Sequence, residues 1–383
     1  MSQCGLMKNG IFMNVTGDID YCCEMPSEGE YRPTFSCDEY DKFKIHGKAN
    51  YESSKTEWLP GCSGCQYNEE VNNKGSLRTV SEMHLTRNGE IVKEDDEAIR
   101  HAIINPGNIC NLACRMCNGG SSSRWVSYTK IKKHIPIEAI DNFNVRHNWI
   151  YDDENMNILY THVLTDKLRF LCFAGGEPTQ NYRVLEMIQY LAEKGYSKKV
   201  CLNIITNGTL TLTDKWRSYF NSFERLELGV SIDGTFDNYE YIRQDSNWEK
   251  VYLNVRDYQA LVKNHHDNSS QVGIAYCWQA LNAHKFLHDR KWFKDNNIGW
   301  DYMTVHDPDY ATLECIHPIL REKYGISKLY HKEYKEENFK KLLKVNGWMD
   351  RLFKKEGALE KQNPDFFDTK LFPFAREVYN GAT

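Results

Sequence analysis

The sequence predicts an α/β fold: a partial (β/α)6 barrel of the TIM type, with a small cysteine-rich module before it and a helical segment after it. Apolar strands alternate with amphipathic helices between residues 96 and 310, which is typical of parallel strands joined by helical crossovers. The length of 383 residues suits two or three domains. A hydrophobic fraction of 41% beside 26% charged residues is enough to bury a sizeable hydrophobic core.

The first segment, 1–95, differs in texture from the rest of the chain. Its cysteines are dense, its glycines are frequent, and no long helical periodicity is evident. We expect short strands and loops that are held together by something other than a large core.

The middle segment, 96–310, carries the barrel signal. Six apolar segments are expected to be strands: 101–105, 168–174, 200–205, 226–233, 272–278 and 300–305. Between them, 182–194 and 247–262 show apolar residues at helical spacing. The last segment, 311–383, is expected to be helical. Its basic stretch 331–355 is interpreted as a solvated helix face, with a contact for an acidic partner as the alternative.

Composition narrows the functional class. No apolar run of about 18 residues is present, and the first residues lack the pattern of a secretory signal, so a cytoplasmic protein without a membrane span is expected. A net charge of −5 argues against a nucleic-acid binder. Thirteen cysteines in such a chain indicate metal or redox chemistry rather than disulfides.

The strongest motif directly follows the first barrel strand. Cys110, Cys114 and Cys117 are spaced C-x3-C-x2-C, so three thiolates of one loop could bind three irons of a cubane cluster and leave the fourth iron open. The spacing does not suit a zinc ribbon, which requires two paired knuckles. Polar residues and glycines surround the loop, which argues against plain core cysteines.

This motif resembles the radical S-adenosylmethionine (radical SAM) superfamily, and later stretches strengthen the resemblance. Gly175-Gly176-Glu177-Pro178 is similar to the GGEP element of that family, and a Thr-Asn-Gly turn contains Asn207. The family implies a [4Fe-4S] cluster that binds S-adenosylmethionine. It also implies that the 175–177 backbone and Glu177 hold the methionine amino group.

The fourth barrel strand contributes further residues that the resemblance implies. Its alternation places Ser231 and Asp233 on the face opposite the apolar side chains, at the carboxyl end where parallel barrels carry their active sites. In relatives, these positions and that of Arg243 contact the ribose and the methionine carboxylate, although a Ser-Asp pair here could also serve only as a helix cap. Met116 replaces the aromatic residue that relatives carry near the adenine, and its flexible thioether can fill that space.

The amino-terminal cysteines form a second pattern. Cys4, Gly17, Cys22 and the Cys62/Cys65 pair resemble the twitch module, a half-size relative of the SPASM domain that holds an auxiliary iron–sulfur cluster. Gly17 fits a hairpin turn that needs positive φ. The module usually follows the barrel, whereas here it precedes it. Two alternatives stay open: a structural zinc site on the same four cysteines, and Cys23 in place of Cys22.

Three further cysteines lie on predicted barrel strands. Cys172 and Cys201 sit within apolar strands and are expected to pack in the core. Cys277 falls on the lumen face of its strand, where a thiol could donate a hydrogen atom to a substrate radical; small luminal residues also arise from packing alone.

The resemblance implies reductive cleavage of S-adenosylmethionine to a 5′-deoxyadenosyl radical, which abstracts hydrogen from a peptide or protein. An auxiliary [4Fe-4S] cluster across the barrel mouth would accept an electron, and a ferredoxin- or flavodoxin-type protein would supply one. The net reaction would be an oxidative modification, a dehydrogenation or an epimerisation, which makes the enzyme an oxidoreductase. Alternatives are a radical SAM dehydrogenase or modifier of a small molecule or nucleoside, and a zinc-stabilised binding protein with a degenerate barrel.

Overall fold

The computed structural model describes residues 4–23, 34–72, 75–86, 90–129, 148–338, 340–342 and 344–345. Most of the predicted helical tail, 311–383, lies outside these ranges, as do residues 130–147. Within the described part, none of the helices is long and apolar enough to cross a membrane.

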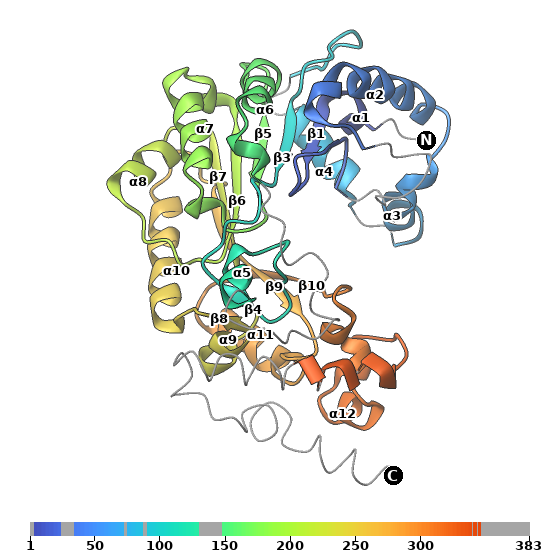
Figure 1. Ribbon diagram of the computed structural model, residues 1–383, viewed down its shortest axis with the longest axis vertical. Coiled ribbons are helices and arrows are strands. Elements are labelled where there is room, and N and C mark those ends of the chain that lie inside the picture. The colour runs from blue at the N-terminus through green and yellow to red at the C-terminus, as the bar shows by residue number, and fades with distance from the viewer. Residues whose placement is uncertain are drawn as a thin grey trace.

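A mostly parallel eight-stranded sheet forms the centre, in the order β10-β9-β7-β6-β5-β3-β1-β2 (Figure 1). The strands of this sheet are β1 Gly10–Met13, β2 Ile19–Asp20, β3 His101–Ile104, β5 Phe170–Phe173, β6 Cys201–Thr206, β7 Arg225–Ser231, β9 Gln271–Trp278 and β10 Gly299–Thr304. All six predicted barrel strands are therefore present, and the prediction of an α/β fold with a parallel sheet is confirmed. The sheet is open at both edges among the described residues, and its description as a partial barrel stays a prediction.

The α-helices of the described residues lie before, between and after these strands along the chain. They are α1 Leu6–Asn9, α2 Tyr40–Ser54, α3 Ser63–Gln66, α4 Leu77–Leu85, α5 Ser123–Thr129, α6 Asp153–Ile158, α7 Tyr182–Glu193, α8 Asp214–Phe220, α9 Phe236–Ile242, α10 Trp248–Lys263, α11 Phe286–Asp295 and α12 Pro318–Lys323. Helices α7, α8 and α10 lie along one side of the sheet (Figure 1). Both predicted helices, α7 and α10, are confirmed within two residues at each end.

Side-chain alternation fixes which face of each strand meets the helices. In β7 the apolar residues Leu226, Leu228 and Val230 are buried and contribute to the main core, whereas the residues between them are only half-buried. In β9, Gly273, Ala275 and Cys277 alternate with buried apolar residues in the same way. The face opposite the helices therefore carries small and polar side chains, as predicted.

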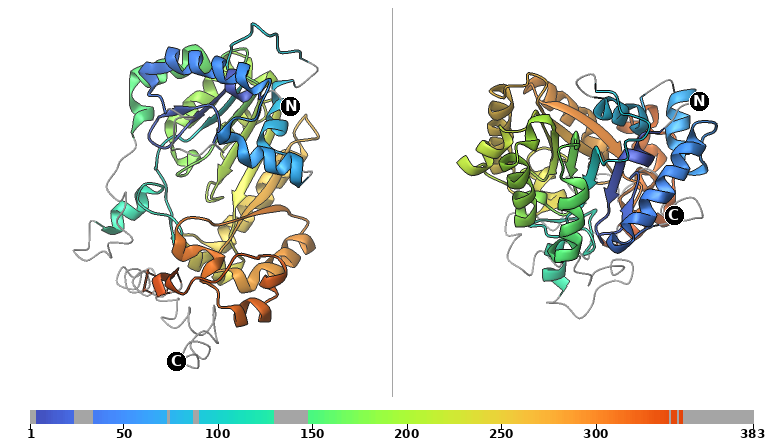
Figure 2. Two further views of the ribbon diagram at one scale, coloured as in Figure 1. Left: turned by 90° about the vertical axis from the view of Figure 1, so that its right-hand side faces the viewer. Right: turned by 90° about the horizontal axis from the view of Figure 1, so that it is seen from above.

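The N-terminal lobe, which comprises the described residues from 4 to 86, continues the same sheet. Strand β1 pairs parallel with β3, with Gly10 opposite His101 and Met13 opposite Ile104. Seen from above, the N-terminal strands lie beside β3 (Figure 2). The predicted boundary at residue 95 therefore marks a change in sequence texture without an interruption of the sheet, and the domain division stays a prediction.

Two features of the N-terminal lobe differ from the expectation of short strands and loops. Helix α2 is 15 residues long and packs through aromatic side chains, with the Tyr21 and Phe43 ring centroids 4.9 Å apart. Helix α4 packs His84 onto Phe170 of β5, with ring centroids 4.2 Å apart. Because Phe170 belongs to a small apolar cluster separate from the main core, α4 covers the sheet face opposite the crossover helices.

Candidate functional site

The loop 105–117, called the cysteine loop below, follows β3 and carries Cys110, Cys114 and Cys117. Two serines at the start of α5 hold it in place. The Ser122 hydroxyl donates to the Leu112 carbonyl oxygen at 2.6 Å, and the Cys110 N–H donates to the Ser123 hydroxyl at 3.2 Å. These serines were not predicted from the sequence, because a hydroxyl that satisfies loop backbone carries no spacing signal.

A two-stranded sheet fastens the second half of the loop. Strand β4 (Ala113–Cys114) pairs antiparallel with β8 (Arg243–Gln244), so that Cys114 lies opposite Arg243. The Trp125 indole N–H donates to the Cys114 carbonyl oxygen at 3.0 Å. The Arg115 guanidinium lies 3.7 Å from the centre of the Tyr241 ring. The backbone around the central cysteine is thereby fixed from both sides.

The predicted Gly-Gly-Glu turn packs directly on the cysteine loop. Gly175 and Gly176 have positive φ, and a Cβ on Gly176 would lie 2.6 Å from the Ile109 carbonyl oxygen. The Glu177 N–H donates to that same oxygen at 2.7 Å. Glycine is required at 176 both for its backbone conformation and for this close approach.

The Glu177 carboxylate is buried and accepts hydrogen bonds from within the chain. Its partners are the Asn207 N–H at 2.6 Å, the Thr206 hydroxyl at 2.8 Å, and the Thr179 N–H and hydroxyl at 3.1 and 2.5 Å. Burial raises its pKa, while the four donors act in the opposite direction. Glu177 therefore joins the Gly-Gly-Glu turn to the Thr-Asn-Gly turn, and its implied contact with a methionine amino group stays a prediction.

Asn207 connects the Thr-Asn-Gly turn to the cysteine loop. Its amide nitrogen donates to the Asn111 side-chain oxygen at 2.8 Å and lies 3.9 Å from the Cys110 sulfur. Its oxygen accepts from the Thr209 N–H at 3.0 Å. The structure thus brings Cys110, Gly176, Glu177 and Asn207 together at the carboxyl ends of β3, β5 and β6.

A buried ion pair completes this edge of the sheet. Asp233 and Arg243 are 0% and 7% exposed, and the Arg243 Nη2 lies 2.8 Å from the Asp233 Oδ2. The Arg243 Nη1 is 3.9 Å from the Cys114 sulfur, and the Cys277 N–H donates to Asp233 Oδ1 at 2.9 Å. Ser231 and Met116 are only half-buried at the same edge.

Cys110 and Cys114 of the cysteine loop lie in surroundings that oppose the ionisation of their thiols. Burial and the neighbouring Cys114 raise the pKa of Cys110 to about 11. The pKa of Cys114 is raised by its hydrogen bond with Cys117 and by burial, and lowered by Arg243. As placed, no three His, Cys, Asp or Glu side chains of the described residues stand in metal-holding geometry.

The donor set nevertheless fits the implied cluster and S-adenosylmethionine. Thiolates are the ligands of iron–sulfur clusters, and a bound cation removes the mutual repulsion that raises these thiol pKa values. Arg243 also keeps one buried N–H, at Nε, without a hydrogen-bond partner in the described part of the chain. A carboxylate ligand could satisfy it.

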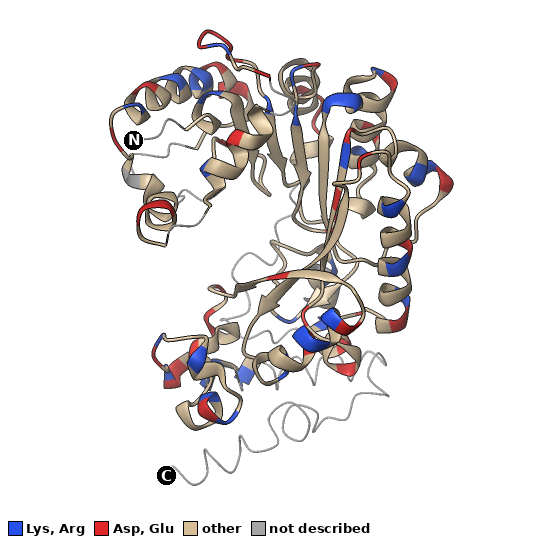
Figure 3. Cartoon of the chain, turned by 180° about the vertical axis from the view of Figure 1, so that it is seen from behind, with Lys and Arg blue, Asp and Glu red and all other residues tan. Residues whose placement is uncertain are grey.

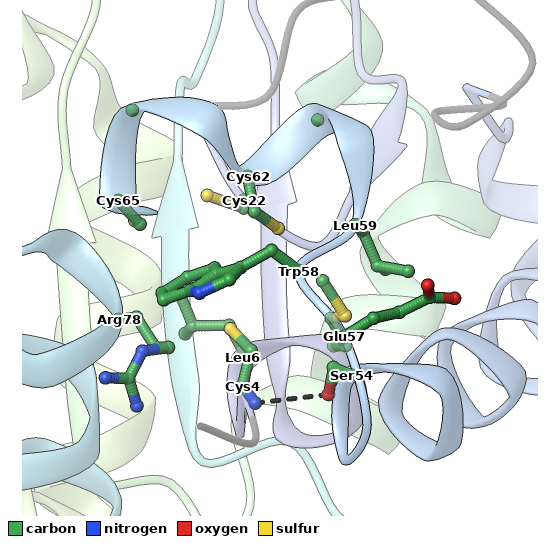
Figure 4. Close-up of a pocket in the computed structure, with 13 residues that line it drawn as sticks. Cys4, Leu6, Cys22, Ser54, Glu57, Trp58, Leu59, Cys62, Cys65 and Arg78 are labelled. Carbon is green, nitrogen blue, oxygen red and sulfur yellow. Dashed lines mark hydrogen bonds between the residues drawn. The ribbon is translucent and has the colours of Figure 1, made fainter. Parts of the chain in front are cut away.

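The four cysteines of the predicted twitch pattern line one pocket (Figure 4). This second cysteine site comprises Cys4, Cys22, Cys62 and Cys65, with Trp58 and Arg78 among the other lining residues. Burial and the neighbouring Cys22 and Cys62 raise the pKa of Cys4 to about 12. Four thiols that line one pocket fit a cation, which either iron or zinc could provide.

The pocket distinguishes between two adjacent cysteines. Cys22 lines it, whereas Cys23 is exposed and is not among the lining residues. Gly17 has φ +92° in the turn of the β1–β2 hairpin, as expected from the spacing. Cys37, which has no place in the twitch-like pattern, is buried.

Two cysteines of this site lie toward the amino end of β1, and its expected position across the barrel mouth stays a prediction. Cys4 precedes β1, and Cys22 follows β2, which runs antiparallel to β1. Both therefore lie at the amino end of β1, whereas the cysteine loop follows the carboxyl end of the neighbouring β3.

One further polar residue at the sheet edge was missed as a site residue. Gln279, directly after β9, is 0% exposed, and neither atom of its side-chain amide has a hydrogen-bond partner within the described ranges. The sequence offered no signal that this amide is isolated. Asn282 lies close by and donates to the carbonyl oxygens of Asp233 and Cys277.

Residues 104–270 match the Radical SAM superfamily and form a domain of that superfamily. Among solved structures, the chain is similar to native anSMEcpe with bound AdoMet, with 20% identity, a TM-score of 0.38, and coverage of 67% of this chain and 62% of that one. It is also similar to Streptococcus suis SuiB bound to precursor peptide SuiA, with 11% identity, a TM-score of 0.34, and coverage of 84% and 58%. The chain thus spans less than two thirds of either structure. None of the curated proteins matches the sequence.

Proposed function

We propose that the protein is a radical SAM enzyme that reductively cleaves S-adenosylmethionine and abstracts hydrogen from a peptide or protein substrate. Superfamily membership of residues 104–270 implies an enzyme. The observation that carries the proposal is the assembly of the cysteine loop with Gly176, Glu177 and Asn207 at one edge of a parallel sheet. Active sites of parallel α/β folds lie at this edge.

Cys110, Cys114 and Cys117 would hold the [4Fe-4S] cluster. Bound S-adenosylmethionine and a reduced cluster supply a 5′-deoxyadenosyl radical that removes a hydrogen atom from the substrate. The chain's own part is to fix the cysteine backbone through Ser122 and β8, and to exclude water by burying the groups behind the loop. The roles of Met116, Gly175, Ser231 and the Arg243 Nε as S-adenosylmethionine contacts are part of this proposal.

The second cysteine site would hold an auxiliary [4Fe-4S] cluster that accepts an electron from the substrate radical. Its four cysteines supply four thiolates, which close a cluster completely. A structural zinc ion on the same ligands is the competing assignment, and metal analysis separates the two. In either case Cys22 is the ligand that the pocket supports, because Cys23 does not line it.

An open sheet edge favours an extended peptide as substrate. Strand β10 pairs with β9 on one side and with no described strand on the other. Its Tyr302 and Met303 are 45% and 64% exposed, and they line a cavity of about 470 Å³ on the face that also carries Glu227. Exposed edges of this kind bind extended peptides through backbone hydrogen bonds.

The distribution of charged residues also favours a peptide over a nucleic acid as the substrate. Lys and Arg are interspersed with Asp and Glu along the helices seen from behind (Figure 3). A nucleic-acid surface instead requires clustered positive charge. The ferredoxin- or flavodoxin-type donor, the cytoplasmic location and the small-molecule alternative stay predictions.

Anaerobic purification of the full chain tests the proposal through iron and sulfide content and through 5′-deoxyadenosine formed with S-adenosylmethionine and a reductant. Two clusters correspond to about eight irons. Alanine at Cys110, Cys114 or Cys117 should abolish cleavage. Alanine at Cys62 and Cys65 should leave cleavage intact but prevent product formation, and Cys23→Ala is the matched control that should change neither.

If the second site alone contained zinc in place of iron, it would be a structural metal site and not an auxiliary cluster site. Zinc at both sites, or no cleavage by an iron-loaded protein, would support the degenerate barrel with a binding function. Equal loss of cleavage in the Cys62 and Cys110 variants would contradict the auxiliary role.

A further inference from the structure

The ion pair behind the cysteine loop joins a guanidinium to a predicted cluster ligand. We propose that Arg243, held by Asp233, sets the reduction potential of the cluster on Cys110, Cys114 and Cys117 by directing an N–H at the Cys114 sulfur. This inference rests on the proposed function and adds a positioning residue to it.

The backbone places the two side chains opposite one another. Cys114 and Arg243 are register partners in the β4–β8 sheet, and the Arg115 N–H donates to the Ile242 carbonyl oxygen at 2.8 Å. The strand pairing therefore fixes the position of the guanidinium, which does not belong to a flexible surface side chain. The Nη1 lies 3.9 Å from the Cys114 sulfur, within reach of an N–H···S hydrogen bond.

Asp233 fixes the other end of the guanidinium. Its Oδ2 lies 2.8 Å from Nη2, and its Oδ1 accepts the Cys277 N–H, so the carboxylate cannot turn away without losing a backbone partner. The Asn282 amide nitrogen donates to the Asp233 carbonyl oxygen at 2.9 Å, which anchors the backbone of the same residue. The pair is buried, with side chains 8% and 0% exposed, so solvent and salt screen it little.

Arg243 and Asp233 should affect the reduction potential of the cluster in opposite directions. Reduction adds negative charge to the cluster, so a nearby positive charge and a hydrogen bond to a ligand sulfur stabilise the reduced form. The carboxylate behind the guanidinium opposes part of this stabilisation. Removing Arg243 should therefore lower the potential, and neutralising Asp233 should raise it.

A purely structural ion pair would behave differently. Loss of either partner would then loosen the loop and reduce cluster content in both variants, without displacing the potential in opposite directions. Arg124 provides a matched control, because it pairs with Asp245 at 2.6 Å beside the same loop but is 43% exposed. A screened pair of this kind should leave the potential unchanged.

The test is a redox titration followed by electron paramagnetic resonance on full-length protein carrying Cys62→Ala and Cys65→Ala, so that only the cluster of the cysteine loop contributes. At a fixed solution potential, Arg243→Gln should lower the ratio of reduced to oxidised cluster at least tenfold, which is about 59 mV for a one-electron couple. Asp233→Asn should raise that ratio, Arg243→Lys should fall between the parent and Arg243→Gln, and Arg124→Gln should match the parent.

Each outcome bears on one of the two proposals. Shifts of the same sign in Arg243→Gln and Asp233→Asn, or no shift in either, overturn the inference while leaving the enzyme assignment intact. If Arg243→Gln does not fold, the rise in Asp233→Asn, whose side chain keeps its shape, decides alone. Absence of an iron–sulfur signal in the unsubstituted protein overturns the proposed function, and this inference with it.

Discussion

The approach of the Gly-Gly-Glu turn to the cysteine loop makes Gly176→Ala an informative substitution. The residue has φ +55°, where an L-side chain costs about 1–2 kcal/mol. Its new Cβ would also lie 2.6 Å from the Ile109 carbonyl oxygen and 2.9 Å from the Gly107 carbonyl oxygen. Both neighbours are backbone atoms, so the chain must shift, at a further cost of about 1–3 kcal/mol. We expect a total loss of about 2–5 kcal/mol in the free energy of unfolding.

Gly195→Ala is the matched control, because Gly195 has φ +74° but nothing within 4 Å of the added Cβ. It should lose only the conformational part, about 1–2 kcal/mol. Thermal unfolding of the two variants beside the parent measures the difference, at about 2 °C per kcal/mol for a long chain. Equal decreases in Tm would show that the turn does not press on the cysteine loop, and the reasoning would be refuted.

Three other predictions test separate parts of the structure. Burial lowers the pKa of His101 to about 3, so the unfolded chain alone takes up this proton as the pH falls below 6.5. Between pH 6.5 and 5 this residue should cost the parent about 1.6 kcal/mol of unfolding free energy, and His101→Phe should reduce the pH-dependent loss by that amount. Equal pH slopes in urea titrations would contradict this. Gln279→Met should raise the free energy of unfolding by at least about 1 kcal/mol in urea, because it removes a buried amide without a described partner; no gain would mean that the amide is satisfied. If the Cys277 thiol donates hydrogen, product made in deuterium oxide should carry the solvent label, and unlabelled product would exclude the thiol.

The sequence was sufficient for the barrel strands because their apolar residues alternate or run continuously. Leu226, Leu228 and Val230 meet the helices at the spacing that a pleated strand imposes. The cysteine spacing likewise predicted which thiols share a loop, because three residues within eight positions cannot separate far.

The local sequence was less informative for helix α2, for strand β1 and for the hydrogen bonds of Glu177. The buried positions of α2 are Tyr40, Phe43, Gly47, Tyr51 and Ser54, a stripe that includes a glycine and a serine and so lacks a clear apolar period. Strand β1 has only four residues, and its partner β3 lies about 90 positions later in the chain. Its place in the sheet depends on long-range pairing, which no local pattern contains. The hydrogen bonds of Glu177 with the Thr-Asn-Gly turn could not be predicted for the same reason.

The pairing of β1 with β3 limits how this protein can be divided or rearranged. A fragment that began at residue 96 would leave β3 with an unpaired edge, which invites aggregation. During synthesis, β1 emerges about 90 residues before its partner β3. The sheet that supports the second cysteine site is therefore complete only after β3 has been made. The cysteine-rich segment is therefore an integral part of the sheet, and grafting it onto another enzyme would require β3 to be transferred with it.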